Sequence, residues 1–263
     1  MIAKPEYLKA SKASDIPTSP GRVLYRSLEI LPGALAWATI LGIFAASRFG
    51  PIGASFFVIA FDIYWLFKTV FLSIHLRAGF RKMQEHLKTD WRAKLETSDI
   101  SHSSLAIRHW SDIYHLILLP FYREPYEVIR HSIEAIAANT YSRDRMLVVL
   151  GVEERAGQEA HEVAERIRNE YGGKFFKFLI AIHPQDLPGE LPGKGSNETW
   201  AAKRAKEELI DPAGIPYERV IVSSFDVDTV APPQYFAILT YHYLTASRPL
   251  RSSYQPIPVY NNN

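Results

Sequence analysis

Two long apolar runs near the N-terminus constrain the fold of this chain more than any other feature. Residues 30–47 carry no charged side chain, and residues 51–76 carry only Asp62 and Lys68. Each run is close to the roughly twenty residues that a helix needs to cross a bilayer. The link between them is too short for anything but a helical hairpin. The sequence therefore predicts a two-helix transmembrane hairpin over residues 30–75; the alternative is a hairpin buried inside a soluble protein.

Basic residues flank both outer ends of this hairpin, whereas the link holds only Arg48. The flanking residues are Lys4, Lys9, Lys12, Arg22 and Arg26 before the first run, and Arg77, Arg81, Lys82, Lys88, Arg92 and Lys94 after the second. Positive charge concentrates on the cytoplasmic side of membrane proteins. We therefore expect a multi-pass protein of the cell inner membrane or plasma membrane. Residues 1–29 would form a cytoplasmic tail, and the chain after the hairpin would also be cytoplasmic.

The segment 76–111 begins with a helical pattern. Apolar side chains recur at steps of three and four residues, at Leu76, Phe80, Met83, Leu87, Trp91 and Leu95. This spacing predicts one amphipathic helix with basic flanks, followed by a linker. Such a helix either lies in the headgroup layer of the membrane or packs its apolar stripe on the soluble domain, and the pattern leaves both options open.

Residues 112–263 alternate between strand and helix patterns. Strands are expected within 112–121, 145–154, 174–184 and 219–229, and helices within 124–141, 157–171, 198–210 and 232–247. Strands that alternate with helices predict an α/β domain with a mostly parallel sheet covered by flanking helices. In such sheets, ligands bind at the carboxyl ends of the strands.

Polar residues collect at those strand ends. Asp226 and Asp228 lie at the end of the fourth strand and, being two residues apart on a strand, would share one face. Two neighbouring carboxylates repel each other unless something positive lies between them. The second strand ends at Glu153–Glu154, and the loop before the fourth strand brings Lys194 and Asn197. Acids near a lysine predict a site for Mg²⁺ or Mn²⁺ and a phosphorylated ligand.

Composition and motif spacing exclude several other sites. The chain has no cysteine, so disulfides, thiolate zinc sites and cysteine nucleophiles are ruled out. A formal net charge of +2 gives no reason to expect nucleic acid. The segment 189–196 (GELPGKGS) has the wrong spacing for a P-loop, and no dinucleotide-binding glycine motif follows the first strand. The remaining candidate is the metal and phosphate site.

Five segments of residues 112–263 resemble, in the same order along the chain, motifs of the membrane-bound family 2 glycosyltransferases. This family includes cellulose- and hyaluronan-synthase-like enzymes. LPFYREP looks like the family's nucleoside-holding loop, and VVLGVEE resembles the strand that ends in an acid near the base. GKGSN is similar to the Lys-x-x-Asn segment, FDVDT looks like the Asp-x-Asp motif, and YQPIPVYNNN is similar to the Gln-x-Pro stretch at the donor site's edge. The resemblance covers residues 112–263.

This resemblance implies a GT-A-type (Rossmann-like) domain that transfers a sugar from a nucleotide-sugar donor, most simply a UDP-sugar. The acceptor would be a sugar or a lipid, and the protein would also contact membrane lipid. It also implies residue roles. Pro120, Tyr122 and Glu124 would lie near the nucleoside, Glu153 or Glu154 near the base, Lys194 at the diphosphate with Asn197 supporting it, and Asp226 and Asp228 at Mg²⁺ or Mn²⁺ with Asp226 also at the donor.

Two motifs of this family do not occur before Asn263: the acidic motif that supplies the acceptor's catalytic base, and a Gln-x-x-Arg-Trp-like motif. No catalytic base is therefore assigned, and we expect it beyond Asn263, with this chain as the N-terminal part of a longer enzyme. One alternative is an inactive relative that binds nucleotide sugars or acts as a scaffold. Another is a nucleotidyltransferase, although the glycine-rich loop typical of that class does not follow the first strand.

Overall fold

The computed structural model describes residues 13–98, 105, 107–187 and 190–256, and the chain divides into two compact units. The first unit contains the residues up to Thr89, and the second is formed by Asp90–Pro256. The break falls inside the segment 76–111, which we expected to be a single helix and linker.

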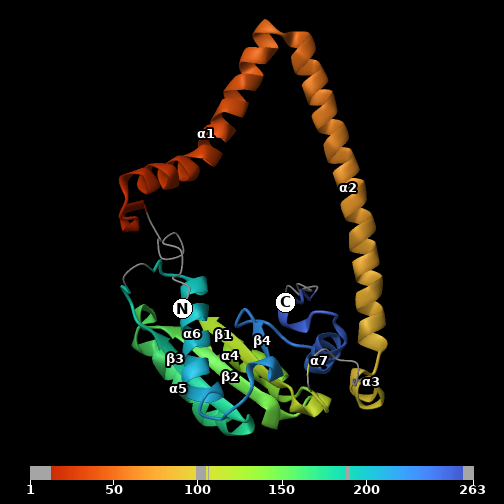
Figure 1. Cartoon of the computed structure of the whole chain (residues 1–263), viewed down its shortest axis with the longest axis vertical. Helices are drawn as coiled ribbons and strands as arrows, with labels where there is room; N and C mark the ends of the chain where they lie inside the picture. The colour runs from red at the N-terminus through yellow and green to blue at the C-terminus, as the bar shows by residue number, and fades with distance from the viewer. Residues whose placement is uncertain (1–12, 99–104, 106, 188–189, 257–263) are drawn as a thin grey trace. The chain divides into compact units, whose positions relative to one another are not determined.

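The first unit contains the two expected apolar helices, α1 (Ser19–Phe49) and α2 (Pro51–Lys88). Neither helix has a buried residue, and both are long and apolar enough to cross a membrane. Pro51 suits the first turn of α2, where its missing N–H would have no helical partner. Pro32 lies inside α1, where a proline removes a backbone hydrogen bond and bends a helix; Figure 1 shows α1 bent along its length.

The expectation of one helix through residues 76–95 is wrong, because α2 ends at Lys88 and a separate helix, α3 (Trp91–Thr97), follows. The side chain of Asp90, the residue after the C-cap of α2 at Thr89, begins the second helix. Its carboxylate accepts hydrogen bonds from the amides of Arg92 and Ala93, each at 3.1 Å, which is the geometry of an N-cap.

The apolar stripe is therefore divided between the two units. Trp91 and Leu95 are 4% and 1% exposed and belong to the core of the α/β unit. Leu76, Phe80 and Leu87 lie on α2 and remain exposed. Packing on the soluble domain, one of the two expected alternatives, applies to the end of the stripe only.

The second unit is built on one parallel sheet, as the sequence predicts. Its strands are β1 (Tyr114–Phe121), β2 (Met146–Glu153), β3 (Lys177–His183) and β4 (Val220–Ser224). Their spatial order is β3-β2-β1-β4, and all three pairings are parallel (Figure 1). The crossover helices are α4 (Tyr126–Ala137), α5 (Gln158–Tyr171) and α6 (Lys194–Ala205), and α7 (Tyr235–Thr245) follows β4. The strand order reverses between β1 and β4, where parallel sheets bind ligands.

Alternating side chains of the strands form two apolar layers. In β1, Ile117 and Leu119 face the core that contains residues of α3, α4, α5 and α7, whereas Leu116 and Leu118 face the core that contains residues of α6. A strand points successive side chains to opposite faces, so a strand buried on both sides is apolar throughout. This is why the central strands were evident in the sequence.

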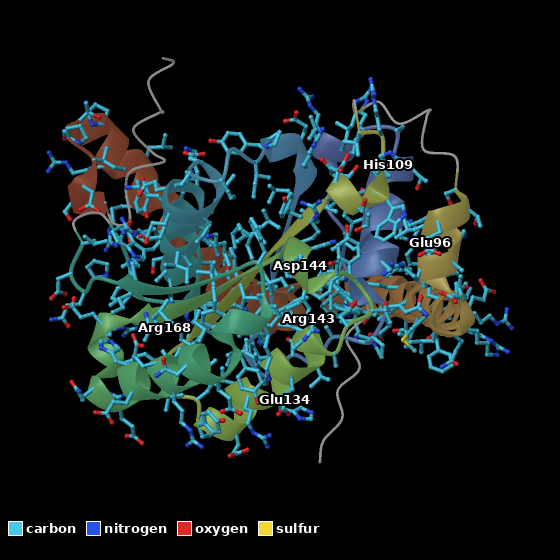
Figure 2. The ribbon with its side chains drawn as sticks, turned by 90° about the horizontal axis from the view of Figure 1, so that it is seen from below. Glu96, His109, Glu134, Arg143, Asp144 and Arg168 are labelled. Atoms are coloured by element: carbon cyan, nitrogen blue, oxygen red, sulfur yellow. The ribbon has the colours of Figure 1, made fainter. Side chains whose placement is uncertain are left out.

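Helices α4 and α5 are also joined by polar contacts at their surface. The carboxylate of Glu134 on α4 accepts hydrogen bonds from Arg130 and from the hydroxyl of Tyr171, both at 2.8 Å. The hydrogen bond from Tyr171 lowers the pKa of Glu134. Figure 2 shows Glu134 on α4 and Arg168 on α5, on the side of the domain that faces the viewer.

His115 in β1 makes the stability of the domain depend on pH. Its ring is fully buried, lies 4.7 Å from the ring centre of Tyr141, and shares a 2.9 Å hydrogen bond with the hydroxyl of Thr240. Burial lowers the pKa of His115 to about 3. The unfolded chain takes up this proton near pH 6.5, so stability is lost as the pH falls from there toward the folded-state value.

We expect the free energy of unfolding to fall by roughly 2 kcal/mol between pH 7.5 and pH 5 because of this group. Chemical unfolding of the detergent-solubilised chain, followed by circular dichroism, measures the loss. His115→Gln should have a shallower pH dependence in this range, whereas His131→Gln, at an exposed position, should retain the full slope. Equal slopes in all three proteins would contradict the assignment to His115.

Candidate functional site

The candidate site lies where β4 separates from β1. The amide of Phe225 donates to the carbonyl of Leu118 at 3.0 Å, and pairing between the two strands stops there. Along β1, every second residue directs its backbone N–H and C=O groups toward β4. After Leu118, the next residue to do so is residue 120, whose N–H would donate to β4. That residue is Pro120, which has no N–H to donate. The sequence of β1 therefore ends the pairing of β4 and leaves Asp226 and Asp228 beyond the strand, not on it.

The two acids still share one side of the chain. Phe225 and Val227 are buried at 6% and 4% exposure, while the intervening Asp226 and the following Asp228 are exposed. The amide of Thr229 donates to the carbonyl of Asp226 at 2.9 Å, which closes a turn.

Helix α4 supports this turn from the core side. The buried hydroxyl of Ser132 donates to the carbonyl of Val227 at 2.6 Å. The carbonyl between the two acids is therefore fixed, and both carboxylates are held toward solvent.

Lys194 and Asn197 lie on a helix, whereas we expected them on the loop before it. Helix α6 begins at Lys194, because Gly193 precedes it with φ of 156° and the amide of Asn197 donates to the Gly193 carbonyl at 3.1 Å. That φ value favours glycine, so the Gly-Lys-Gly segment starts the helix instead of extending the loop. Glycines at 193 and 195 also leave open space beside the first turn.

Lys194 and Asp226 are in direct contact. The ammonium group of Lys194 forms an ion pair with the carboxylate of Asp226 and lies 3.5 Å from that of Glu198. The hydrogen bond that Lys194 donates to Asp226 raises the pKa of Lys194. Glu198 is itself held by a 2.7 Å hydrogen bond from the hydroxyl of Ser224, the last residue of β4. The positive group beside Asp226 is thus a lysine of the chain itself.

Asn197 fixes α6 on the sheet. It is 1% exposed, and its side-chain amide donates to the carbonyl of Gly151 in β2 at 2.8 Å. A Cβ atom at Gly151 would come within 2.7 Å of the Asn197 side-chain oxygen, so glycine permits this close approach. Through Asn197 and Lys194, the first turn of α6 reaches from β2 to the segment after β4.

A second polar group surrounds Tyr122, just after β1. The guanidinium groups of Arg123 and Arg155 each lie 4.9 Å from the centre of the Tyr122 ring. Arg155 also forms an ion pair with Glu153, which is only 5% exposed at the end of β2. Glu153, one of the two acids expected near the nucleotide base, is therefore already neutralised by an arginine.

The other expected site residues have local contacts. Pro120 is buried within β1. The Glu124 carboxylate accepts hydrogen bonds from the amides of Tyr122 and Arg123 at 2.7 and 3.1 Å, which holds the loop after β1 in a turn. The Glu154 carboxylate accepts from the amide of Gln185 at 3.0 Å, after β3. Of the Gln-x-Pro stretch at 254–263, all but its first three residues lies outside the described part of the chain.

The register relates the two polar groups. Pro120 pairs with Gly151, and Glu153 stands one residue beyond the last β1–β2 pair. The group at Tyr122 thus lies over β1 and β2, and the group at Lys194 reaches the segment after β4. Neighbouring strands are about 4.8 Å apart, so the backbones of β2 and β4, on either side of β1, are roughly 10 Å apart.

A divalent cation fits the donor set of the turn after β4. Among the described residues, no three or more His, Asp or Glu side chains gather into a ready-made metal cage. Mg²⁺ often binds through one or two carboxylates together with phosphate oxygens, and Asp226 and Asp228 supply two exposed carboxylates on one side. Lys194 already places one positive charge against Asp226.

Four residues of this region were not identified from the sequence: Ser132, Arg123, Arg155 and Glu198. Glu198 is four residues from Lys194, and this helical spacing would have revealed it if α6 had been expected to begin at Lys194. Each arginine lies two residues beyond the end of its strand, β1 or β2, where charged side chains gather. Ser132 gave no signal, because a buried serine inside an amphipathic helix has no distinctive pattern.

The arrangement favours an anion next to a cation. The N-terminus of a helix carries partial positive charge and unpaired amides, and α6 adds Lys194 at its first position. Carboxylates that suit a hard cation lie beside it. Comparison with known proteins identifies no family for this chain. No protein-family model matches the sequence, and no curated protein matches it.

Proposed function

We propose that this chain is the donor-binding part of a membrane-anchored, metal-dependent glycosyltransferase with a GT-A-type domain. One observation carries the proposal: Lys194 and Asp226, which the resemblance assigns to the same diphosphate, lie in contact at the carboxyl edge of a parallel sheet. They are 32 positions apart in the chain. A shared site explains their contact, and the neighbouring glycines leave room for a ligand.

In this proposal, Asp226 and Asp228 hold Mg²⁺ or Mn²⁺, and Lys194 with the first turn of α6 binds the diphosphate. The metal, when bound, neutralises charge on the departing nucleoside diphosphate. Ser132 and the buried Phe225 and Val227 keep the carboxylates oriented toward the donor.

The loop at Tyr122–Glu124 binds the nucleoside, and the guanidinium groups beside Tyr122 supply hydrogen-bond donors for it. Asn197 and Gly151 position α6, and with it Lys194. An acceptor hydroxyl would be deprotonated by a group that the described residues do not assign.

Titration of the detergent-solubilised chain with UDP, with and without Mn²⁺, tests the proposal. We expect heat of binding for UDP that depends on Mn²⁺. A sugar-transfer assay on the full-length gene product then separates an enzyme from a relative that only binds the nucleotide. Absence of UDP binding in the presence of Mn²⁺ would refute the proposal.

The membrane orientation is part of the same proposal, because nucleotide sugars are supplied from the cytoplasm. The chain has no cysteine, so a single introduced one is the only thiol. With α1 and α2 spanning the membrane, a cysteine at Gly50, between the helices, should react with an impermeant maleimide added outside intact cells. A cysteine at the exposed Ser142 of the α/β unit should react only after lysis. The reverse pattern would place the site on the wrong side for its donor.

A further inference from the structure

The contact between Lys194 and Asp226 has a consequence for how ligands enter the site. One ammonium group faces the carboxylates of Asp226 and Glu198, and a third carboxylate, that of Asp228, is exposed two residues from the first. Lys194 therefore has two carboxylates beside it, and the carboxylate of Asp228 belongs to the same turn as that of Asp226. A ligand of either charge therefore meets a side chain of the same charge there.

A free divalent cation is opposed by Lys194. To bind Asp226, the cation must displace an ammonium group that already pairs with that carboxylate, and the two positive charges then repel each other. A free diphosphate is opposed by the carboxylates. It can reach Lys194 only by taking it from Asp226, and it then faces the carboxylates of Asp226 and Glu198 without a cation between them.

A cation already bound to a diphosphate meets neither obstacle. Its metal faces the carboxylates while its phosphate oxygens face Lys194, so both partners of the broken ion pair gain a new partner of opposite charge. Breaking the pair costs little, because the side chains of Lys194 and Asp226 are 51% and 69% exposed and an exposed pair is well screened.

We propose that Lys194 is a tethered counter-cation of Asp226, and that the site takes the preformed complex of a divalent cation with a diphosphate instead of either ion alone. This rests on the proposed function. Glu198 has a defined part in the exchange. Since Ser224 holds its carboxylate 3.5 Å from the Lys194 ammonium group, it keeps the lysine at the site after Asp226 turns to the metal.

Mn²⁺ binding to the full chain in detergent, measured by the paramagnetic resonance of free Mn²⁺ with and without UDP, tests the exchange. In the unaltered protein, UDP should tighten Mn²⁺ binding by roughly tenfold or more, as expected for paired charge-assisted contacts. Lys194→Met should have opposite effects on the two ligands. Binding of Mn²⁺ alone should become severalfold tighter, and binding of UDP with Mn²⁺ should become roughly tenfold weaker.

Lys203→Met is the matched control, because it removes an exposed lysine from the same helix. It should change neither value. If Lys194→Met leaves Mn²⁺ binding in the absence of UDP unchanged, the exchange is wrong, and the proposed function survives as long as UDP binding requires Mn²⁺. If UDP has no effect on Mn²⁺ affinity in the unaltered protein, Mn²⁺ can have no effect on UDP affinity either, and both proposals fail. If the unaltered protein binds no UDP with Mn²⁺, both proposals fail.

Discussion

Replacing Asp228 by Asn should weaken Mn²⁺-dependent UDP binding about a hundredfold, which corresponds to the roughly 2–3 kcal/mol that a contact with a charged group contributes. The substitution keeps the shape of the side chain and removes a full negative charge from the turn after β4. Within the described chain no ion pair engages Asp228, so its loss should leave the empty protein as stable as before or slightly more stable. Calorimetric titration measures the binding, and urea unfolding measures the stability.

Asp144→Asn makes the same change of charge at the opposite edge of the sheet. Asp144 is exposed in the turn before β2 (Figure 2), whereas the site follows the strands. This control should bind UDP normally. A destabilised Asp228→Asn protein that binds UDP as well as the control would make the acid a structural residue, and the metal site would have to be abandoned.

Trp91→Ala should lower the free energy of unfolding of the α/β unit by about 3–5 kcal/mol, the usual cost of removing a buried aromatic side chain. The Trp91 ring is 4% exposed and lies 5.3 Å from the ring of Tyr241 on α7. The backbone amides of Trp91 and Arg92 also donate to the side chain of Gln234, just before α7. The short helix after α2 is therefore part of the domain core, and unfolding in urea measures its contribution.

Leu87→Ala serves as the comparison, since Leu87 belongs to the same apolar stripe in the sequence but is 60% exposed on α2. It should leave the unfolding of the α/β unit unchanged within about 0.5 kcal/mol. Equal losses for the two substitutions would support a single amphipathic helix through this segment, which is the arrangement that the structure replaces.

The sheet was predictable because its signals are local. The central strands β1 and β2 are apolar on both faces, and the amphipathic helices between them carry charge on one side. The alternation of strands and helices then leaves few topologies, and parallel pairing of the strands follows. The two apolar helices were predictable from length and composition for the same reason.

The beginnings of two helices were not predictable, since each depends on a residue outside the periodic pattern. The apolar stripe continues through Leu87 and Trp91 without interruption, but the cap at Asp90 divides the helix. Helix α6 starts four residues earlier than its charge pattern indicates, because Gly193 adopts a conformation that favours glycine. Contacts between distant residues, such as Lys194 with Asp226, follow only from the assembled sheet.

Pro120 also determines from which residue onward ligand binding can change the rate of amide hydrogen exchange. The amide of Phe225, the residue after β4, is the last in this segment to be bonded to β1, so it should exchange slowly with deuterated solvent. The backbone just beyond it has left the sheet and should exchange orders of magnitude faster. Occupation of the site would then appear as protection that begins sharply at Asp226. A single imino acid in the neighbouring strand thus sets, within one residue, where the sheet stops protecting the backbone amides.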